Sequence, residues 1–145
     1  MPAAMDPFAG NDKRPVVLYD GICRMCNFWV NWVLDNDPAP GRVRFAALQS
    51  DAGRGLLERS GRNADDISSI VFVTPDDAYI KSEAVLEIGT VIQATSPISA
   101  VAKGIVPRPV ADAAYDAIAA NRYKIAGKIE ALRLTDAERG DRFLT

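Results

Sequence analysis

Short apolar runs alternate with segments of helical periodicity along the first two thirds of the chain. Val16–Tyr19 and Ile70–Val73 are apolar and bounded by turn-forming residues, which is typical of buried strands. Arg42–Leu48 alternates in polarity as a half-buried strand does. Tyr79–Lys81 follows a tight turn at Pro75–Asp77 and is expected to pair antiparallel with the preceding strand. The pattern predicts four strands, of which the last two form a hairpin.

Helical segments separate these strands. Residues 23–35 carry apolar side chains at helical spacing. These side chains are Met25, Phe28, Trp29, Trp32 and Val33. We expect the two tryptophans to be core anchors. Ser50 is a favourable N-cap for a helix to about Arg59, and Ser82 is expected to cap a helix to about Ala94.

The order strand, helix, strand, helix, hairpin, helix predicts an α/β protein with a thioredoxin-like βαβα-ββα core, which we place at residues 16–95. Residues 96–106 and 110–126 are predicted to form additional C-terminal helices, divided by two prolines, and a capping box at 135–138 predicts a short last helix. Residues 96–145 are therefore expected to be a helical extension packed on the same domain. Residues 1–15 are expected to be a flexible leader.

The composition fits a single globular domain, because 48% of the 145 residues are hydrophobic and 25% are charged. The net charge of -2 argues against a nucleic-acid partner. No apolar run approaches the roughly 18 residues that cross a bilayer. The N-terminus shows neither the basic start nor the apolar stretch of a secretory signal. We expect a cytoplasmic protein, and the sequence leaves its oligomeric state open.

The residue types present restrict the chemistry that the chain can perform. The sequence holds two cysteines and no histidine, which excludes Cys-His and Ser-His-Asp machinery and any His-ligated metal. One CxxC supplies two of the four ligands of a structural zinc, so a zinc site would have to bridge two subunits. Glycine-rich phosphate-binding spacing is absent. We therefore expect no bound cofactor and no metal.

Cys23 and Cys26 lie where the first strand passes into the first helix, at a spacing that allows a disulfide. The positive end of the helix dipole favours a thiolate at Cys23, and Arg24 adds positive charge. Cys26 is expected to be more buried and to keep its proton longer. We predict that Cys23 attacks a substrate disulfide and that Cys26 resolves the mixed disulfide. The alternatives are two inert core thiols or a metal site.

Two residues before the CxxC are further candidates. Asp20 lies three residues before Cys23 and either organises the loop by capping its N–H groups or accepts a proton from Cys26. Its negative charge would oppose thiolate formation at Cys23. Gly21 is expected to supply a backbone angle or a close approach that a side chain would forbid.

The segment Tyr19–Asn27 resembles the signature of the DCC family of predicted thiol-disulfide oxidoreductases, which is named for the aspartate and cysteines matching Asp20, Cys23 and Cys26. The resemblance continues through residues 44–50, 81–86 and 107–109, and then through Asp112, residues 115–116 and 121–124, and Gly127. It implies a thioredoxin-like fold and a CxxC redox centre, with a substrate that is unassigned for the family at large.

The chain departs from this pattern in two places. Many family members carry a further cysteine after the segment matching residues 121–123, whereas residues 128–134 here contain none, so no third thiol is expected to act. The thioredoxin fold usually places a cis-proline opposite the CxxC, and this chain has Ile67–Ser69 there. Docking of a substrate backbone is expected to differ accordingly.

Ser82, Arg122 and Tyr123 are the remaining candidates. Ser82 stands where glutathione-binding relatives of this fold hold a carboxylate, and a plain N-cap is the alternative. Arg122 and Tyr123 either line the site or bind an anion, and the alternative is that Arg122 and Lys124 are favourable cations at a helix C-terminus. We expect a thiol or disulfide substrate and electrons from a thioredoxin or glutathione system. The alternative function is a non-enzymatic binding module that recruits a protein partner through the helical tail.

Overall fold

The computed structural model describes residues 8–37, 41–92, 96–127 and 143–144 of the chain. Its described strands form a sheet in the order β4-β3-β1-β2-β5. The strands are β1 (Val16–Tyr19), β2 (Arg44–Ala47), β3 (Val71–Val73), β4 (Ala78–Ile80) and β5 (Phe143–Leu144). As predicted, β1 pairs parallel with β2, and β3 and β4 form an antiparallel hairpin. β5 pairs parallel with β2, so the C-terminal extension is not entirely helical as the sequence predicts.

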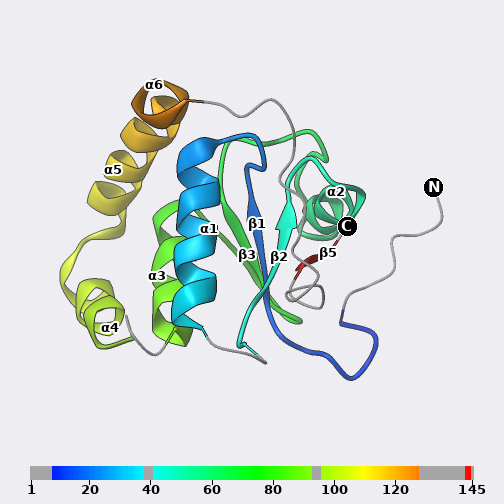
Figure 1. The fold of residues 1–145 in the computed structure, drawn as a ribbon. Coiled ribbons are helices and arrows are strands. Elements are labelled where there is room, and N and C mark those ends of the chain that lie inside the picture. Colours follow the sequence, from blue (N-terminus) through cyan, green and yellow to red (C-terminus); the bar gives the residue numbers. More distant parts are fainter. Residues whose placement is uncertain (1–7, 38–40, 93–95, 128–142, 145) are drawn as a thin grey trace.

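Helices cover both faces of this sheet. They are α1 (Arg24–Asn36), α2 (Asp51–Arg59), α3 (Lys81–Val91), α4 (Ser96–Ile105), α5 (Arg108–Ala120) and α6 (Arg122–Ala126). Figure 1 shows α1 and α3 together on one face, α2 on the other, and α4 to α6 in a column outside α1 and α3. The order of elements confirms the α/β class and the thioredoxin-like βαβα-ββα core. No helix among the described residues is long and apolar enough to span a membrane.

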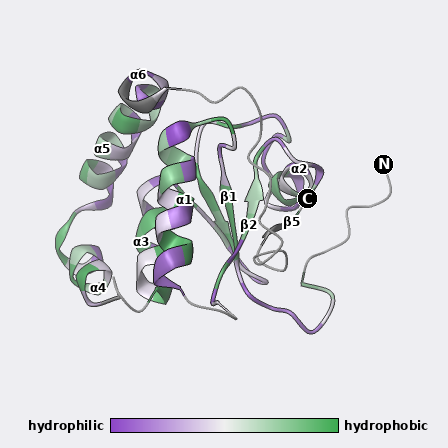
Figure 2. Ribbon diagram, in the orientation of Figure 1, coloured by the Kyte–Doolittle hydropathy of each residue, from purple (hydrophilic) through white to green (hydrophobic). Residues whose placement is uncertain are grey.

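The side chains of the central strand β1 pack in two separate core layers, because alternate side chains of a strand point to opposite faces of the sheet. Val17 and Tyr19 pack in a cluster with α1 and α3. Val16 and Leu18 pack in a second cluster with Leu57 of α2. Figure 2 shows these central strands in hydrophobic colours between the helices. The apolar run Val16–Tyr19 of the sequence thus forms the buried central strand of the sheet.

The segment before β1 contributes one side chain to the core. Phe8 is buried in the α2-side cluster. The guanidinium groups of Arg44 and Arg59 lie 5.5 and 5.0 Å from the centroid of its ring. Phe8, which the sequence places in a flexible leader at residues 1–15, is thus part of the core, and the flexibility of the leader stays a prediction. Residues 1–7 lie outside the described part of the chain.

Helix α1 buries a different stripe from the one that its aromatic residues suggest. Its buried side chains are Asn27, Val30, Val33 and Leu34. Phe28 is 74% exposed and Trp32 is 40% exposed, so the prediction that both tryptophans are core anchors is wrong for Trp32. The helix carries two apolar stripes, and helical periodicity alone does not tell which one faces the sheet.

The predicted helix at 110–126 is divided in two. Asn121 ends α5 and precedes α6, and its side-chain amide donates to the carbonyl of Ala117 at 2.7 Å. Pro109 lies in the first turn of α5, where a missing N–H group is tolerated. The break at Asn121 places α6 against the start of α1. The predicted helix at 135–138 lies outside the described residues.

Candidate active site

The CxxC turn is held by hydrogen bonds around the first turn of α1. The Cys23 N–H donates to the carbonyl of Asp20 at 3.2 Å. The side-chain amide of Asn27 donates to the carbonyls of Gly21 (2.8 Å) and Cys23 (2.9 Å). Cys23 is the N-cap of α1, and its Sγ accepts from the N–H of Cys26 at 3.3 Å. Sequence reasoning missed Asn27, although a polar residue four positions after Cys23 on the buried stripe was a usable signal.

The exposures of the two cysteines are the reverse of the prediction. Cys23 has an exposed fraction of 0%, whereas Cys26 is half-buried. The N–H of Arg24 donates to the carbonyl of Gly127 at 3.2 Å, so the chain after α6 lies across the first turn of α1. The prediction that Cys26 is the more buried thiol is wrong, because it considered only the helix and not the extension that covers its N-terminus.

The electrostatic environment keeps the proton on Cys26. Burial raises the pKa of the Cys26 thiol, and its hydrogen bond with the Cys23 side chain raises it further. Electrostatic interactions with Cys23 and with the Asp20 carboxylate also raise the pKa of Cys26. The structure therefore agrees with the expectation that Cys26 keeps its proton longer. The side chain of Arg24 is exposed at the first turn of α1.

Asp20 is 3% exposed and accepts from four donors. Its Oδ1 accepts from the N–H of Ile22 (3.1 Å) and the amide of Gln49 (2.7 Å). Its Oδ2 accepts from Nε of Arg122 (3.1 Å) and from the hydroxyl of Tyr123. Burial raises the pKa of Asp20, but these hydrogen bonds outweigh it, and the pKa lies below its ordinary value. Four donors use the whole acceptor capacity of a carboxylate.

Arg122 and Tyr123 bring the helical extension into this network. The guanidinium of Arg122 also donates to the carbonyls of Ala119 (2.7 Å) and Ile67 (3.2 Å), and it lies 4.6 Å from the ring centroid of Tyr123. Burial and the neighbouring Asp20 carboxylate raise the pKa of Tyr123 to about 12. The structure therefore brings both residues to Asp20, about one hundred positions away in sequence.

Gln49 is a site residue that sequence reasoning missed. Its amide nitrogen donates to Asp20, and its oxygen accepts from the N–H of Gly21 at 2.9 Å. Both backbone polar groups of Gly21 are thus hydrogen bonded, one to Gln49 and one to Asn27. The sequence did hold a signal for this contact. Because β1 and β2 are parallel, Asp20 after β1 and Gln49 after β2 meet at the same edge of the sheet.

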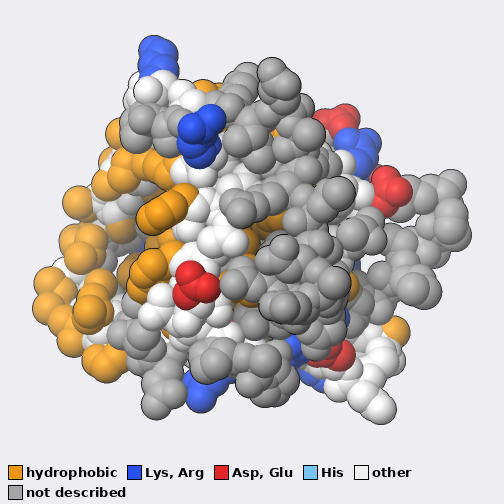
Figure 3. Space-filling model, viewed as in Figure 1, with side chains coloured by type: hydrophobic (Ala, Val, Ile, Leu, Met, Phe, Trp, Pro, Cys, Tyr) orange, Lys and Arg blue, Asp and Glu red, His pale blue; other side chains and the backbone are white. Residues whose placement is uncertain are grey.

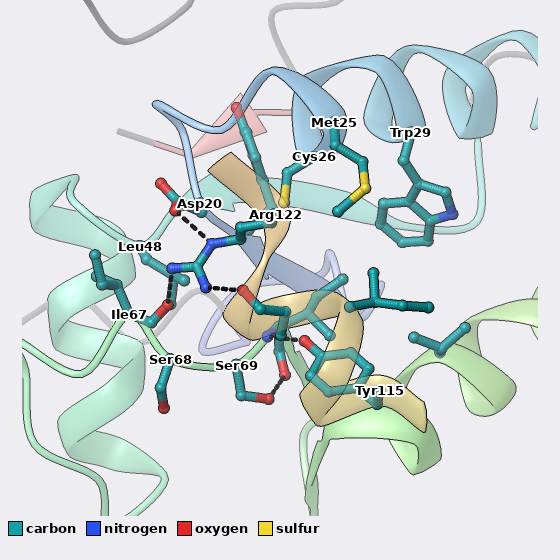
Figure 4. A pocket seen from close by; sticks show the side chains of 15 residues that line it. Asp20, Met25, Cys26, Trp29, Leu48, Ile67, Ser68, Ser69, Tyr115 and Arg122 are labelled. Carbon is teal, nitrogen blue, oxygen red and sulfur yellow. Dashed lines mark hydrogen bonds and ion pairs between the residues drawn. The ribbon is translucent and has the colours of Figure 1, made fainter. Parts of the chain in front are cut away.

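A cavity of about 380 Å³ lies beside Cys26 (Figure 4). Met25, Cys26 and Trp29 of α1 form one wall, and the segment Ile67–Ile70 before β3 forms another. The remaining lining residues are Tyr19, Asp20, Leu48, Val85, Tyr115, Ile118, Ala119 and Arg122. Cys23 does not line it. The cavity is therefore a mainly apolar space onto which one of the two thiols opens.

Two backbone groups of the segment opposite Cys26 are bound by the extension. The N–H of Ile70 donates to the hydroxyl of Tyr115 at 2.8 Å, and the carbonyl of Ile67 accepts from Arg122. The Oγ of Ser69 donates to the carbonyl of Ile70 at 2.7 Å and accepts from the N–H of Lys81 at 2.9 Å. This is the segment where the expected cis-proline is missing.

Ser82 is not the N-cap that the sequence predicts. Helix α3 begins at Lys81, and Ser82 is buried in its first turn. Its hydroxyl and its N–H (3.3 Å) both donate to Oδ1 of Asp112, which belongs to α5. These hydrogen bonds lower the pKa of Asp112, the hydroxyl contributing most. The carboxylate expected at this helix N-terminus is thus supplied by the chain itself.

The described part of the chain contains no group of three or more side chains arranged to hold a metal ion. The structure instead groups Cys23 and Cys26 at the start of α1 with a buried carboxylate beside them. Together with the fold, this arrangement defines a thioredoxin-like protein of the CxxC class.

The chain belongs to the DCC1-like thiol-disulfide oxidoreductase family, whose model matches residues 17–128. It is 46% identical over 127 residues to a chloroplastic DCC family protein of Arabidopsis thaliana, covering 88% of this chain and 73% of that protein. It is 36% identical over 129 residues to the uncharacterized protein YuxK of Bacillus subtilis, covering 89% of this chain and 93% of that protein. No solved structure matched. These findings confirm the resemblance noted in the sequence.

Proposed function

We propose that the protein is a thiol-disulfide oxidoreductase that exchanges disulfides through Cys23 and Cys26. The observation that carries this proposal is the hydrogen bond from the N–H of Cys26 to the sulfur of Cys23 at the N-terminus of α1. A backbone donor and the positive end of a helix stabilise negative charge on that sulfur. Membership of the family supports redox chemistry in general.

The roles assigned from the sequence make Cys23 the nucleophile and Cys26 the resolving thiol. The hydrogen bond supports Cys23 as the thiolate, and the raised pKa of Cys26 supports Cys26 as the protonated partner. Because Cys23 is fully buried, this order of events requires the surroundings of Cys23 to open.

Asp20 in this proposal organises the loop rather than accepting a proton. Its acceptor sites are filled by four donors, and its lowered pKa makes it a poor base. Arg122 and Tyr123 position that carboxylate, and Gly21 supports it through Gln49. Arg24 contributes positive charge beside Cys23. Ser82 acts structurally, by binding Asp112.

Two single variants test the proposal. We expect Cys23→Ser and Cys26→Ser each to abolish the intramolecular disulfide and to lower the dithiol-dependent reduction of a small model disulfide at least about a hundredfold. Mass spectrometry of the intact protein and the rate of disulfide reduction are the measurements. Ala100→Ser, at an exposed position on α4, is the control and should behave like the parent. A single cysteine variant as active as the parent would refute the proposal.

The electron donor and the location follow as parts of the same proposal. A dithiol donor of the thioredoxin type is favoured over glutathione, because Asp112 occupies the helix N-terminus at Ser82. A cytoplasmic location is proposed from the sequence. The name of the plant relative states that it is chloroplastic, and this applies to that protein.

A binding module is the second candidate function. Exposed apolar side chains on α4 and α5 favour it, among them Ile98, Val101, Ile105 and Val110. Figure 3 shows hydrophobic side chains gathered along the left side, where these helices lie. The same disulfide-exchange assay distinguishes the two functions. If the parent protein is folded but reduces no disulfide, the result supports the binding module.

A further inference from the structure

The geometry points to Cys26 as the sulfur that carries the substrate, and to a low-molecular-weight thiol or disulfide with an apolar body as that substrate. The ligand binds in the cavity between α1, α5 and the segment before β3. This inference rests on the proposed disulfide exchange through the CxxC pair, but it reverses the roles predicted from the sequence for the two cysteines, because Cys26 lines the cavity and Cys23 is buried.

The cavity has the size and surface of a small-molecule site. Its volume of about 380 Å³ lies within the usual range of roughly 300–1,000 Å³ for such sites. Met25, Trp29 and Ile118 supply apolar surface for the body of a ligand. Asp20 and Arg122 are the charged side chains in the lining, and they are paired with each other. A neutral apolar ligand therefore suits this space better than an ionic one.

The position of the two sulfurs decides which one a ligand meets. Cys26 lines the cavity, and its side chain is drawn there in Figure 4. Cys23 is fully buried and lies outside the lining. A molecule that enters the cavity therefore encounters Cys26 first.

An extended polypeptide finds two backbone groups of the wall beside Cys26 already bound. Peptides that bind as strands rely on unpaired N–H and C=O groups of the receptor. Here the N–H of Ile70 is bound by Tyr115, and the carbonyl of Ile67 is bound by Arg122. Pairing a substrate strand along this segment would break both hydrogen bonds. The wall opposite Cys26 therefore disfavours a protein disulfide as substrate.

The chemistry at Cys26 balances as two exchange steps. A substrate thiolate attacks the Cys26 sulfur of the internal disulfide, which forms the bond between Cys26 and the substrate and breaks the bond to Cys23. The electron pair leaves on Cys23, whose thiolate is stabilised by the N–H of Cys26. In the reverse step, the Cys23 thiolate attacks Cys26, restores the internal disulfide and expels the substrate as a thiolate.

The net reaction with a disulfide substrate follows the same path. Cys26 gives up its proton as its sulfur attacks, one half of the substrate bonds to Cys26, and the other half leaves as a thiolate that takes up this proton. Cys23 then releases the first half. An external dithiol reduces the internal disulfide and completes the cycle.

The test opens the internal disulfide of the oxidised parent protein with two thiols, phenylmethanethiol and 2-mercaptoethanesulfonate. Each reaction is quenched with N-ethylmaleimide, and each rate is divided by the rate of the same thiol with a small reference disulfide. Trypsin cleaves after Arg24 and so places the two cysteines in separate peptides. We expect the phenylmethyl adduct on Cys26 and the maleimide on Cys23. The normalised rate should be at least about tenfold higher for phenylmethanethiol, because the cavity buries its ring.

A pair of matched variants connects the preference to the cavity. Ile118→Glu places a charge in the lining and is expected to remove the preference for phenylmethanethiol. Ile105→Glu makes the same change at an exposed position on α4 outside the lining and should keep it.

The outcomes separate this inference from the proposed function. An adduct on Cys23, or equal normalised rates for the two thiols, overturns the inference and leaves disulfide exchange intact. A parent protein that forms no internal disulfide overturns the proposed function, and the inference with it.

Discussion

At the scale of single residues, the Asp20 carboxylate receives donors from the CxxC loop, from the end of β2 and from α6. The buried charge is tolerated because a guanidinium lies against it and every acceptor site is filled. The sequence marked Asp20 and Arg122 as separate candidates. It did not join them, because no local pattern encodes a contact across about one hundred residues.

Replacing Asp20 by asparagine should destabilise the protein strongly. The substitution leaves the guanidinium of Arg122, which is 14% exposed, without its counter-charge. Removing one partner of a buried pair costs about 3 kcal/mol or more of the free energy of unfolding. Urea denaturation measures the change. Asp65→Asn, in the exposed pair with Arg54, is the matched control and should leave the unfolding midpoint almost unchanged. Equal effects of the two variants would contradict the prediction.

Tyr123 should make the stability of the protein depend on alkaline pH. Its pKa is raised from 10.0 to about 12, so the folded state holds a proton that the unfolded state releases earlier. The stabilisation by its hydroxyl is therefore complete below pH 10 and is lost as the pH rises from 10 to 12. The free-energy difference between parent and Tyr123→Phe should be constant from neutral pH to about 10 and then shrink. A difference that stays constant to pH 12 would contradict this.

At the scale of elements, the sequence predicted those parts that depend on neighbouring residues. Apolar runs, turns and the cap at Ser50 lie close together in the chain, and the structure confirms them. Ser82 was mistaken for a cap because its true partner, Asp112, lies 30 residues away. The strand β5 has two residues, too few to show an alternation of polar and apolar positions. It is stabilised by its pairing with β2, which the sequence pattern does not reveal.

The hydroxyl of Tyr115 links α5 to the wall of the cavity, so removing this hydroxyl should destabilise the wall. Tyr115→Phe leaves the N–H of Ile70 without its acceptor. Leaving a buried donor unsatisfied costs about 1–3 kcal/mol, so we expect a loss of stability of that order. Hydrogen exchange should show faster exchange at the Ile70 amide, while the amides of β1 serve as the internal control. Unchanged protection of Ile70 would show that the hydroxyl does not hold this segment.

At the scale of the whole molecule, the helical extension completes the site. Asp112, Tyr115, Arg122 and Tyr123 all contact residues of the core around the CxxC. The family resemblance pointed to residues 121–124. The spacing of apolar residues in the extension, however, predicted only an amphipathic helix packed on the core. Its effect on the site arises from the break at Asn121, which brings α6 onto the start of α1. A single asparagine among apolar residues at helical spacing is not enough to predict such a break in the helix.

Gly127 ties the extension to the N–H of Arg24, next to Cys23, and the effect of this contact can be tested with two glycines of positive φ. Gly127 has a φ of 86° and a ψ of −178°, a region that is essentially restricted to glycine. Gly127→Ala strains the backbone, with no atom close to the new methyl group. The strain should loosen the hydrogen bond from the Arg24 N–H to the Gly127 carbonyl and uncover Cys23. We expect alkylation of Cys23 by iodoacetamide to become about tenfold faster.

Gly61→Ala is the matched control, because Gly61 has a φ of 79° and also leaves open space for a methyl group. It lies just after α2, away from the CxxC, so its strain should lower global stability without exposing Cys23. Tryptic mapping after iodoacetamide treatment reports each cysteine separately, since the chain is cut at Arg24. Equal alkylation rates in the two variants would mean that global unfolding, and not the chain at Gly127, governs access to Cys23. A selective rise in Gly127→Ala would instead show that the extension decides which sulfur of the pair meets a substrate.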